Sequence, residues 1–269
     1  MYYLKVNDGA KITVEDMNRD SSKVIVLVHG WPINKDMFEY QKNIFIDNGF
    51  RVVSYDIRGF GDSSTPASGY NYNQLATDLY CVIDNLKVDH VTLVGFSMGG
   101  AICVHYMAMY DNYRVSKLIL AGAAVPSFTK TRHNPHGNDI EKINQLIMKT
   151  YQDRPQMINE FSKKVFALNH SDEFQTWFKS LCLSASGIGT IKTAISLREE
   201  DVFDDLKEIN VPTAIFHGKL DQICPFEFAK IMEKEIPNAT LVPFEQSGHG
   251  LFYDERDKFT QLVMEFIKC

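Results

Sequence analysis

The chain has 269 residues and a formal net charge of −6, with 45% hydrophobic and 23% charged residues. This length allows one large α/β core with an insertion, and the two fractions are ordinary for a globular protein. The acidic balance argues against a nucleic-acid-binding protein and against a protein held on membranes by a basic surface. An acidic small-molecule substrate is compatible with it, because local fields can differ from the total charge.

The N-terminus and the cysteines favour a cytoplasmic protein. Residues 1–8 contain no basic segment followed by an apolar one, so we expect no signal peptide. No apolar run approaches the roughly 20 residues of a membrane span. The five cysteines are an odd number without CxxC spacing, which favours reduced thiols over disulfides or a metal site. They are Cys81, Cys103, Cys182, Cys224 and Cys269.

Strands and helices alternate along the first half of the chain. Two opening strands, the second over 11–14, are joined by a hairpin turn at residues 7–9. A buried apolar strand then starts a series of strand, helix, strand, helix, strand, helix and strand. Their ranges are 23–28, 36–47, 51–55, 72–86, 91–95, 101–110 and 117–121. This order predicts a parallel sheet with right-handed crossovers.

The alternation stops between residues 126 and 205. Amphipathic helical stretches dominate there, and no strand is predicted. The helices are expected at 140–151, 157–166, 174–184 and 188–198. Later strands are expected at 211–216 and 240–244, and a last helix at 259–267. An insertion of about eighty residues is more than a loop. We therefore predict a core of residues 1–125 and 206–269, with a helical cap of residues 126–205 over the site.

Ser97 stands in a Gly-x-Ser-x-Gly run at residues 95–99, between a predicted strand and a predicted helix. This layout is that of a nucleophile elbow, a sharp turn that exposes the serine hydroxyl. The strained serine brings strand and helix close together, so side chains at Gly95 and Gly99 would collide. The run arises by chance in about one chain in ten of this length. The assignment of Ser97 as a nucleophile therefore depends on whether the sequence also supplies a base and an orienting acid.

Two residues beyond later strands complete a triad. Asp221 follows the strand at 211–216, and His249 follows the strand at 240–244, so both can reach the C-terminal edge of the sheet. Ser97 is then the nucleophile, His249 the general base and Asp221 the group that orients the base. The competing acids are Asp56, Asp62 and Asp201. Asp56 is expected instead to brace the turn that follows it.

The backbone amides of Trp31 and Met98 are expected to form the oxyanion hole. Met98 begins the helix after the nucleophile, where the helix dipole favours negative charge. Trp31 follows the strand that ends at His29, and Pro32 lacks its own N–H but leaves the Trp31 donor intact. His29 is expected to hold this loop by hydrogen bonds rather than to act in catalysis.

On these residues the chain resembles the α/β-hydrolase superfamily, and more narrowly the bacterial arylesterases and the cofactor-free (non-haem) chloroperoxidases or perhydrolases. The resemblance covers nearly the whole chain and is weakest in the cap. The matching runs are residues 29–32, 55–63, 95–100, 221–226 and 248–250. It implies the α/β-hydrolase fold, the Ser97–His249–Asp221 triad, the Trp31 and Met98 oxyanion donors, and no cofactor. It also implies a second activity, in which hydrogen peroxide replaces water at the acyl-enzyme and the resulting peracid oxidises halide.

The predicted reaction is the hydrolysis of small carboxylic esters, with neither a nucleic acid nor a membrane as partner. By position, five residues are expected to line the substrate pocket. They are Trp31, Phe128, Phe161, Ile223 and Phe226. Polar and basic residues stand where a more apolar entrance is expected, so the sequence leaves the choice of substrate open. They are Lys130, Arg132, His133 and His136.

Other readings of the same residues stay open. Lactonases and carbon–carbon bond hydrolases share the triad, and some receptors or signalling proteins of this fold retain it. Haloalkane dehalogenases and epoxide hydrolases use an aspartate nucleophile, so Ser97 argues against them. Assembly into a homo-oligomer is also left open by the sequence.

Overall fold

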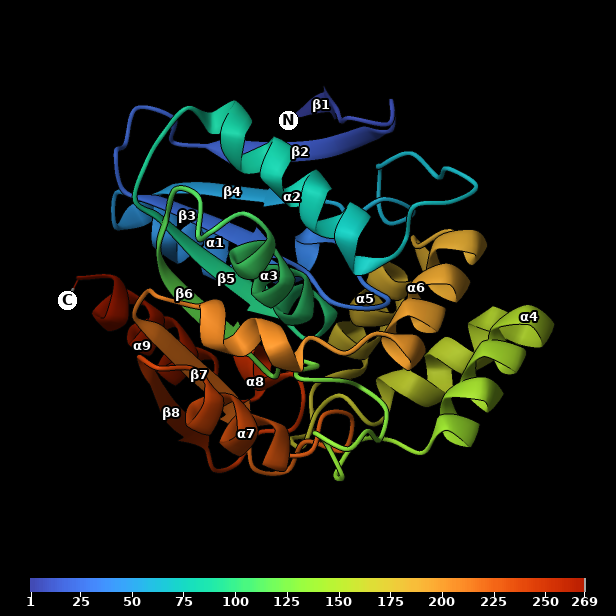
Figure 1. Cartoon of the computed structure of the whole chain (residues 1–269). Coiled ribbons are helices and arrows are strands. Elements are labelled where there is room, and N and C mark those ends of the chain that lie inside the picture. Colours follow the sequence, from blue (N-terminus) through green and yellow to red (C-terminus); the bar gives the residue numbers. More distant parts are fainter. Residues whose placement is uncertain (269) are drawn as a thin grey trace.

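The computed structural model describes residues 1–268 and contains one eight-stranded sheet (Figure 1). Its strand order is β1-β2-β4-β3-β5-β6-β7-β8. The strands are β1 (Tyr2–Lys5), β2 (Lys11–Met17), β3 (Val24–Val28), β4 (Arg51–Tyr55), β5 (Val91–Phe96), β6 (Val115–Ala121), β7 (Thr213–Gly218) and β8 (Ala239–Phe244). The pairings of β1 with β2 and of β2 with β4 are antiparallel, and all the others are parallel. The mostly parallel sheet predicted from the alternation is confirmed.

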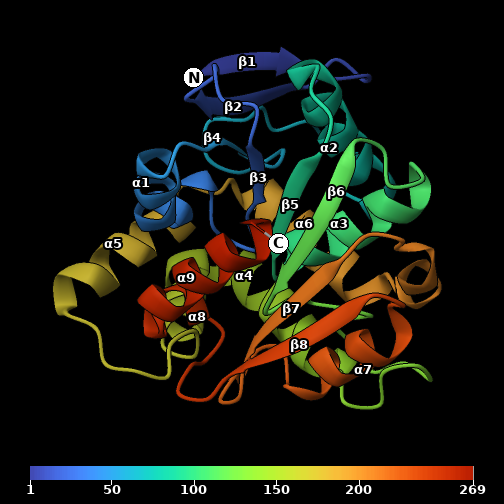
Figure 2. The same ribbon diagram turned by 90° about the vertical axis from the view of Figure 1, so that its left-hand side faces the viewer.

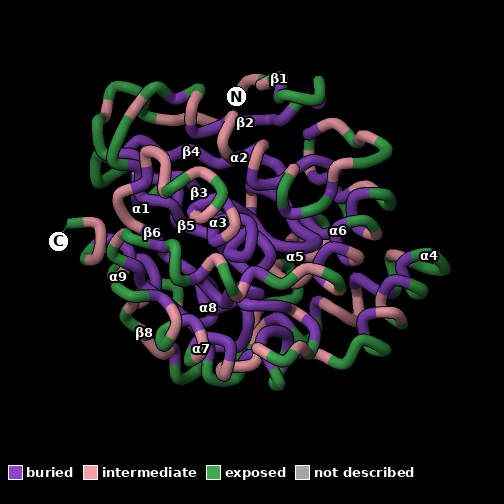
Figure 3. Tube along the Cα trace, viewed as in Figure 1, coloured by how far each residue is buried: buried purple, intermediate pink, exposed green. Residues whose placement is uncertain are grey.

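Helices cover both faces of the sheet (Figure 2). On one face lie α1 (Glu39–Asp47), α8 (Leu251–Asp254) and α9 (Arg256–Lys268). On the other lie α2 (Tyr72–Leu86), α3 (Met98–Met109) and α7 (Glu227–Glu235). Because the central strands are covered on both sides, β3, β4 and β5 are buried along their whole length (Figure 3). This explains why β3 is an unbroken apolar run instead of an alternating one.

Three helices between β6 and β7 lie at one end of the sheet (Figure 1). They are α4 (Ile140–Ser162), α5 (Asp172–Leu183) and α6 (Gly187–Glu199), and α4 packs against both of the others. Only isolated bridges, Ser127 with Asp201 and Thr129 with Asn138, add sheet-like pairing in this part of the described chain. The boundaries 126 and 205 of the cap stay a prediction.

Helix α4 replaces two predicted helices and has a sharp break at Asp153 (φ −154°, ψ 82°). The carboxylate Oδ1 of Asp153 accepts a hydrogen bond from the amide of Gln156 at 3.0 Å, as an N-cap residue does. Pro155 lies within the first turn after the break, where its missing N–H removes no helical hydrogen bond. The second half therefore begins earlier than predicted, and it ends at Ser162 instead of Phe166.

Some short elements differ from the prediction. The helix predicted at 36–47 is divided into a 3-10 helix, η1 (Lys35–Phe38), and α1, and η2 (Phe203–Glu208), ahead of β7, was not predicted. Helices α7 and α8 were also missed. Within residues 1–268 no single helix is both long and apolar enough to cross a membrane, although α5 and α6, bent by 88°, pass the length and composition test as a pair. Four cysteines are free thiols and Cys269 lies outside the described residues.

Candidate active site

The turn after β5 places Ser97 at the N-terminus of α3. Its backbone has φ 54° and ψ −120°, a conformation that costs about 1–3 kcal/mol for a residue with a side chain. A Cβ atom on Gly95 would lie 2.7 Å from Gly100 Cα, and one on Gly99 would overlap the backbone oxygens of Val28 and His29. The predicted steric need for glycine at both positions is confirmed. The turn therefore holds the Ser97 hydroxyl clear of the strand.

Ser97, His249 and Asp221 come from the ends of β5, β8 and β7 and meet at one edge of the sheet. The Nε2 atom of His249 lies 3.0 Å from Ser97 Oγ, and its Nδ1 atom lies 2.7 Å from Asp221 Oδ2. All three residues are buried. In this geometry the Nδ1–H of the imidazole donates to the carboxylate, which leaves Nε2 free to accept the serine proton.

The loop after β7 fixes the carboxylate of Asp221. Its Oδ1 atom accepts hydrogen bonds from the amides of Ile223 at 2.8 Å and Cys224 at 2.9 Å, which leaves Oδ2 for His249. His217 supports this loop, because its Nε2–H donates to the carbonyl of Cys224 at 2.8 Å. Burial lowers the pKa of His217, so its ring is neutral at physiological pH. Sequence reasoning missed His217; a histidine at a strand end, four residues before Asp221, was the available signal.

A second buried carboxylate, that of Asp254, holds the loop that carries His249. Its Oδ2 atom accepts from the amides of Gly248 at 2.8 Å and Ala167 at 2.8 Å. Its Oδ1 atom accepts from the amide of Leu168 at 3.2 Å and from Nε2 of His170 at 2.9 Å. Asp254 thus ties the His249 loop to the segment that follows α4. No local sequence pattern indicates this contact, because in three of the four bonds the partner of Asp254 lies more than eighty positions away.

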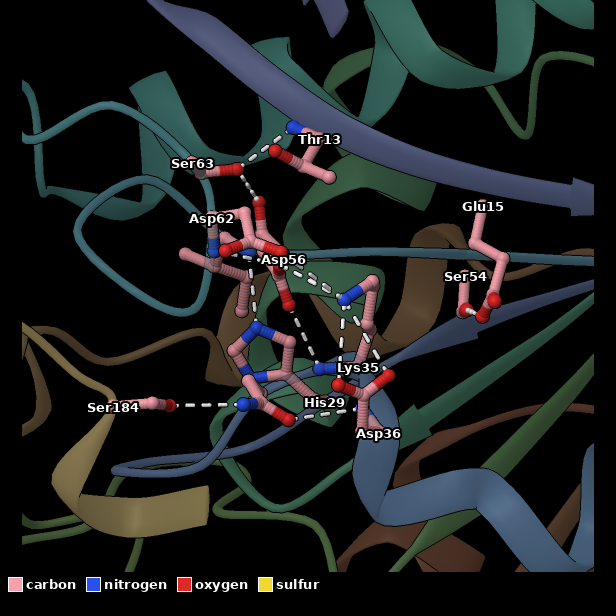
Figure 4. A network of polar contacts seen from close by, with 12 residues as sticks. Thr13, Glu15, His29, Lys35, Asp36, Ser54, Asp56, Asp62, Ser63 and Ser184 are labelled. Atoms are coloured by element: carbon pink, nitrogen blue, oxygen red, sulfur yellow. Dashed lines mark hydrogen bonds and ion pairs between the residues drawn. The ribbon is translucent and has the colours of Figure 1, made fainter. Parts of the chain in front are cut away.

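A polar network supports the loop after β3 (Figure 4). His29 Nε2 accepts from the amide of Ile57 at 2.9 Å, so the proton is on Nδ1, which donates to the Gly30 carbonyl at 2.8 Å. Burial lowers the pKa of His29 to about 4. Asp56 lies beside it and accepts from the amides of Lys35 at 2.9 Å and Asp62 at 3.0 Å. His29 and Asp56 therefore fix the backbone of the neighbouring loops by hydrogen bonds, as expected.

The loop supported by this network carries Trp31. Within residues 1–268 the Trp31 amide donates to no backbone or side-chain acceptor. Met98 is the first residue of α3, and first-turn amides have no acceptor inside their own helix. The indole Nε1–H of Trp31 donates to the Thr190 carbonyl of α6 at 2.9 Å, and its ring meets Phe161 edge-on at 5.2 Å. This contact links the loop directly to the helices over the sheet edge.

Ser97 opens into a cavity of about 150 Å³, called here the Ser97 cavity. It is lined by Trp31, Ser97, Phe128, Asn138, Lys142, Ile143, Leu146, Phe161, Lys164, Ala194, Leu197, Gln222 and Ile223. Four of the five predicted pocket residues are among them. Phe226 is not, and its prediction needs correction: its ring packs against His217 and lies under the Lys219 ammonium, at 4.3 Å.

The basic residues expected at the entrance do not line this cavity either. None of Lys130, Arg132, His133 and His136 is among its lining residues. Lys142 and Lys164 line the cavity instead, and sequence reasoning did not single them out.

Among residues 1–268 no group of three or more His, Cys, Asp or Glu side chains is arranged to hold a metal ion.

Comparison with known proteins agrees with this geometry. A profile of the α/β-hydrolase fold matches residues 23–160. The solved structure of the esterase EaEST from Exiguobacterium antarcticum has a TM-score of 0.97 and 47% identity, and covers 99% of each chain. The bromoperoxidase from Bacillus anthracis has a TM-score of 0.94 and 33% identity, over 100% of this chain and 99% of its own. The AB hydrolase superfamily protein YisY of Bacillus subtilis is 42% identical over 98% of both chains. These similarities confirm the resemblance and the fold predicted from the sequence.

Proposed function

Since the chain belongs to the α/β-hydrolase family, we propose that it is a serine esterase that cleaves small carboxylic esters through an acyl-enzyme. The observation that carries this proposal is the buried chain of hydrogen bonds from Ser97 through His249 to Asp221. It links a nucleophile, a base and an orienting carboxylate at the floor of a cavity with mostly apolar walls. The similar esterase from Exiguobacterium antarcticum supports the same reaction class.

Acylation begins when Ser97 Oγ attacks the ester carbonyl. His249 Nε2 takes the hydroxyl proton, and the carboxylate of Asp221 stabilises the imidazolium that forms. The negative charge on the carbonyl oxygen is received by the amides of Trp31 and Met98. One such donor is worth about 3 kcal/mol of barrier. His249 then gives its proton to the departing alkoxide, and the alcohol leaves.

Deacylation repeats these steps with water as the nucleophile. His249 removes a proton from the water as it attacks the acyl carbon, and then returns the proton to Ser97 Oγ as the acid leaves. Helices α4 and α6 supply six of the thirteen residues that line the cavity, and we assign them to a cap that shields the acyl-enzyme from bulk solvent. The small volume of the cavity favours short acyl chains.

Perhydrolysis is a second candidate activity, favoured by the likeness to a bromoperoxidase. Hydrogen peroxide would attack the acyl carbon in place of water and lose its proton to His249. The products are a peracid and free Ser97 Oγ–H, and the peracid then oxidises halide in solution to hypohalous acid while it is reduced to the carboxylic acid. The same triad and the same two amides serve this route.

The test is steady-state turnover of p-nitrophenyl esters of increasing acyl length, with and without hydrogen peroxide. Fast turnover of short esters that is lost in Ser97→Ala, together with loss of fluorophosphonate labelling, is the expected result. Ser180→Ala, on an exposed position of α5, is the matched control and should behave as wild type. Undiminished esterase activity in Ser97→Ala would overturn the mechanism. A single burst of one equivalent would favour a ligand receptor over an enzyme.

A further inference from the structure

We propose that the ester cleaved at Ser97 carries a second, ionised carboxylate, which Lys142 and Lys164 bind at the mouth of the Ser97 cavity. This inference rests on the proposed esterase function. It names the substrate class by its charge: monoesters of dicarboxylic acids, in which an apolar chain separates the ester from the free carboxylate.

The first observation is where the two lysines lie. Lys142 is in the first turn of α4 and Lys164 follows the end of the same helix, yet both line the Ser97 cavity. The break of α4 at Asp153 allows its two ends to border one space. Both lysines are exposed, so we assign their ammonium groups to the mouth of the cavity and not to its floor.

The second observation is the charge balance at this mouth. Of the side chains that line the Ser97 cavity, Lys142 and Lys164 are the charged ones, and no acidic side chain is among them. Within residues 1–268, Lys164 lies within 4.0 Å of no carboxylate. Lys142 lies 3.9 Å from Asp139, whose other oxygen is held by Lys130 at 2.5 Å. The mouth is therefore positive, in a chain whose net charge is −6.

A neighbouring lysine shows the contrast. Lys149 lines an adjoining groove that shares Lys142, Leu146, Phe161 and Lys164 with the Ser97 cavity. Its ammonium lies 2.5 Å from a carboxylate oxygen of Glu160, so its charge is already neutralised. Lys149 therefore offers no free charge to a substrate. The two at the mouth lack such a close partner.

The apolar side chains of the cavity wall favour an apolar chain between the ester and the carboxylate of the substrate. Ile143, Leu146 and Phe161 lie on α4 between Lys142 and Lys164 in the chain and line the same cavity. A substrate with its ester carbonyl at Ser97 would place an apolar chain along these side chains and its carboxylate beside the ammonium groups. Each exposed ion pair should raise the apparent affinity about two- to fivefold, and salt should weaken it.

The experiment compares mono-p-nitrophenyl adipate with p-nitrophenyl hexanoate, two acyl chains of six carbons that differ in the terminal carboxylate. Both are measured with wild type, Lys142→Gln, Lys164→Gln, the double variant and Lys149→Gln, at low and high ionic strength. The double variant should lose about five- to twentyfold in kcat/KM toward the adipate ester, mostly through KM. It should stay within twofold of wild type toward the hexanoate ester, which also shows that the variant is folded.

The control and the ionic strength separate a local site from a general effect of charge. Lys149→Gln should leave both esters within twofold of wild type, and salt should reduce the preference of wild type but not that of the double variant. If the ratio of the two kcat/KM values is the same in wild type and the double variant, or if Lys149→Gln lowers it equally, the inference is wrong while the esterase function stands. If wild type turns over neither ester, the proposed function fails and the inference falls with it.

Discussion

Asp254 offers a test of how the catalytic histidine is positioned. Its carboxylate accepts hydrogen bonds from Gly248, beside His249, and from three donors in the segment at 167–170. The His249 loop packs tightly here, since a Cβ on Gly248 would lie 2.9 Å from the amide of Ala167. Among residues 1–268, Asp254 makes no hydrogen bond to Ser97, His249 or Asp221, so it acts on the triad through the backbone of the loop.

The effect of Asp254→Asn can be worked out from the two oxygens. An asparagine can keep its oxygen toward Gly248 and Ala167, but its amino group then faces the Leu168 amide, which loses its acceptor. One unsatisfied donor costs about 1–3 kcal/mol, and loss of the negative charge weakens the remaining bonds. We expect a loss of about 2–4 kcal/mol in the free energy of unfolding, or roughly 5–10 °C in Tm.

Activity should fall for a separate reason. A shift of about 1 Å at a catalytic group can reduce the rate about a hundredfold. We therefore expect kcat for a short p-nitrophenyl ester to drop about ten- to a hundredfold, with KM little changed, when Asp254→Asn is assayed well below its Tm.

The control is His170→Phe, which keeps a ring beside Phe166 and Phe174 but removes one donor to Asp254 and leaves the Gly248 bond intact. It should lower Tm slightly and leave kcat within twofold. If Asp254→Asn lowers Tm as expected but has the kcat of wild type, Asp254 is a purely structural residue and the reasoning is refuted.

The sequence was most informative where a local pattern decides the structure. Strand β4 and helix α2 have the predicted bounds to the residue. For α2, Asn71 caps the first turn by accepting from Gln74, and Lys87 ends the helix in the left-handed region. Helix α8 has only four residues, which is too few to show the 3.6-residue period of a helix in the sequence. Its position depends on tertiary contacts, such as the hydrogen bond that the Gln41 side chain donates to the Phe252 carbonyl.

In the site, too, residues placed by local sequence patterns could be predicted, and residues placed by tertiary contacts could not. Ser97, Asp221 and His249 could be found because each follows a strand that is itself recognisable, and parallel strands end at the same edge. The groups that hold or flank them could not, because their partners are distant in the chain. Asp254 meets residues more than eighty positions away. The two lysines at the cavity mouth share a wall only because α4 is broken between them.

Three further substitutions probe the elbow, the triad and the buried histidine. Asp221→Asn should reduce kcat about 10⁴-fold with little change in Tm, because the amide presents N–H to His249 Nδ1 and leaves the wrong tautomer facing Ser97; a loss under tenfold would contradict the assigned role. Gly99→Ala should lower the free energy of unfolding by about 3 kcal/mol or more, since its Cβ would overlap backbone oxygens. Gly187→Ala, with open space around its Cβ, should be tolerated in the same thermal melts. Burial lowers the pKa of His29 from its usual 6.5 to about 4, so between these pH values the unfolded chain binds a proton that the folded chain does not. Its contribution to stability is therefore lost as pH falls through this window, by roughly 3 kcal/mol. Urea unfolding at several pH values should show a steeper decline for wild type than for His29→Gln, and equal slopes would show that the ring is not held neutral.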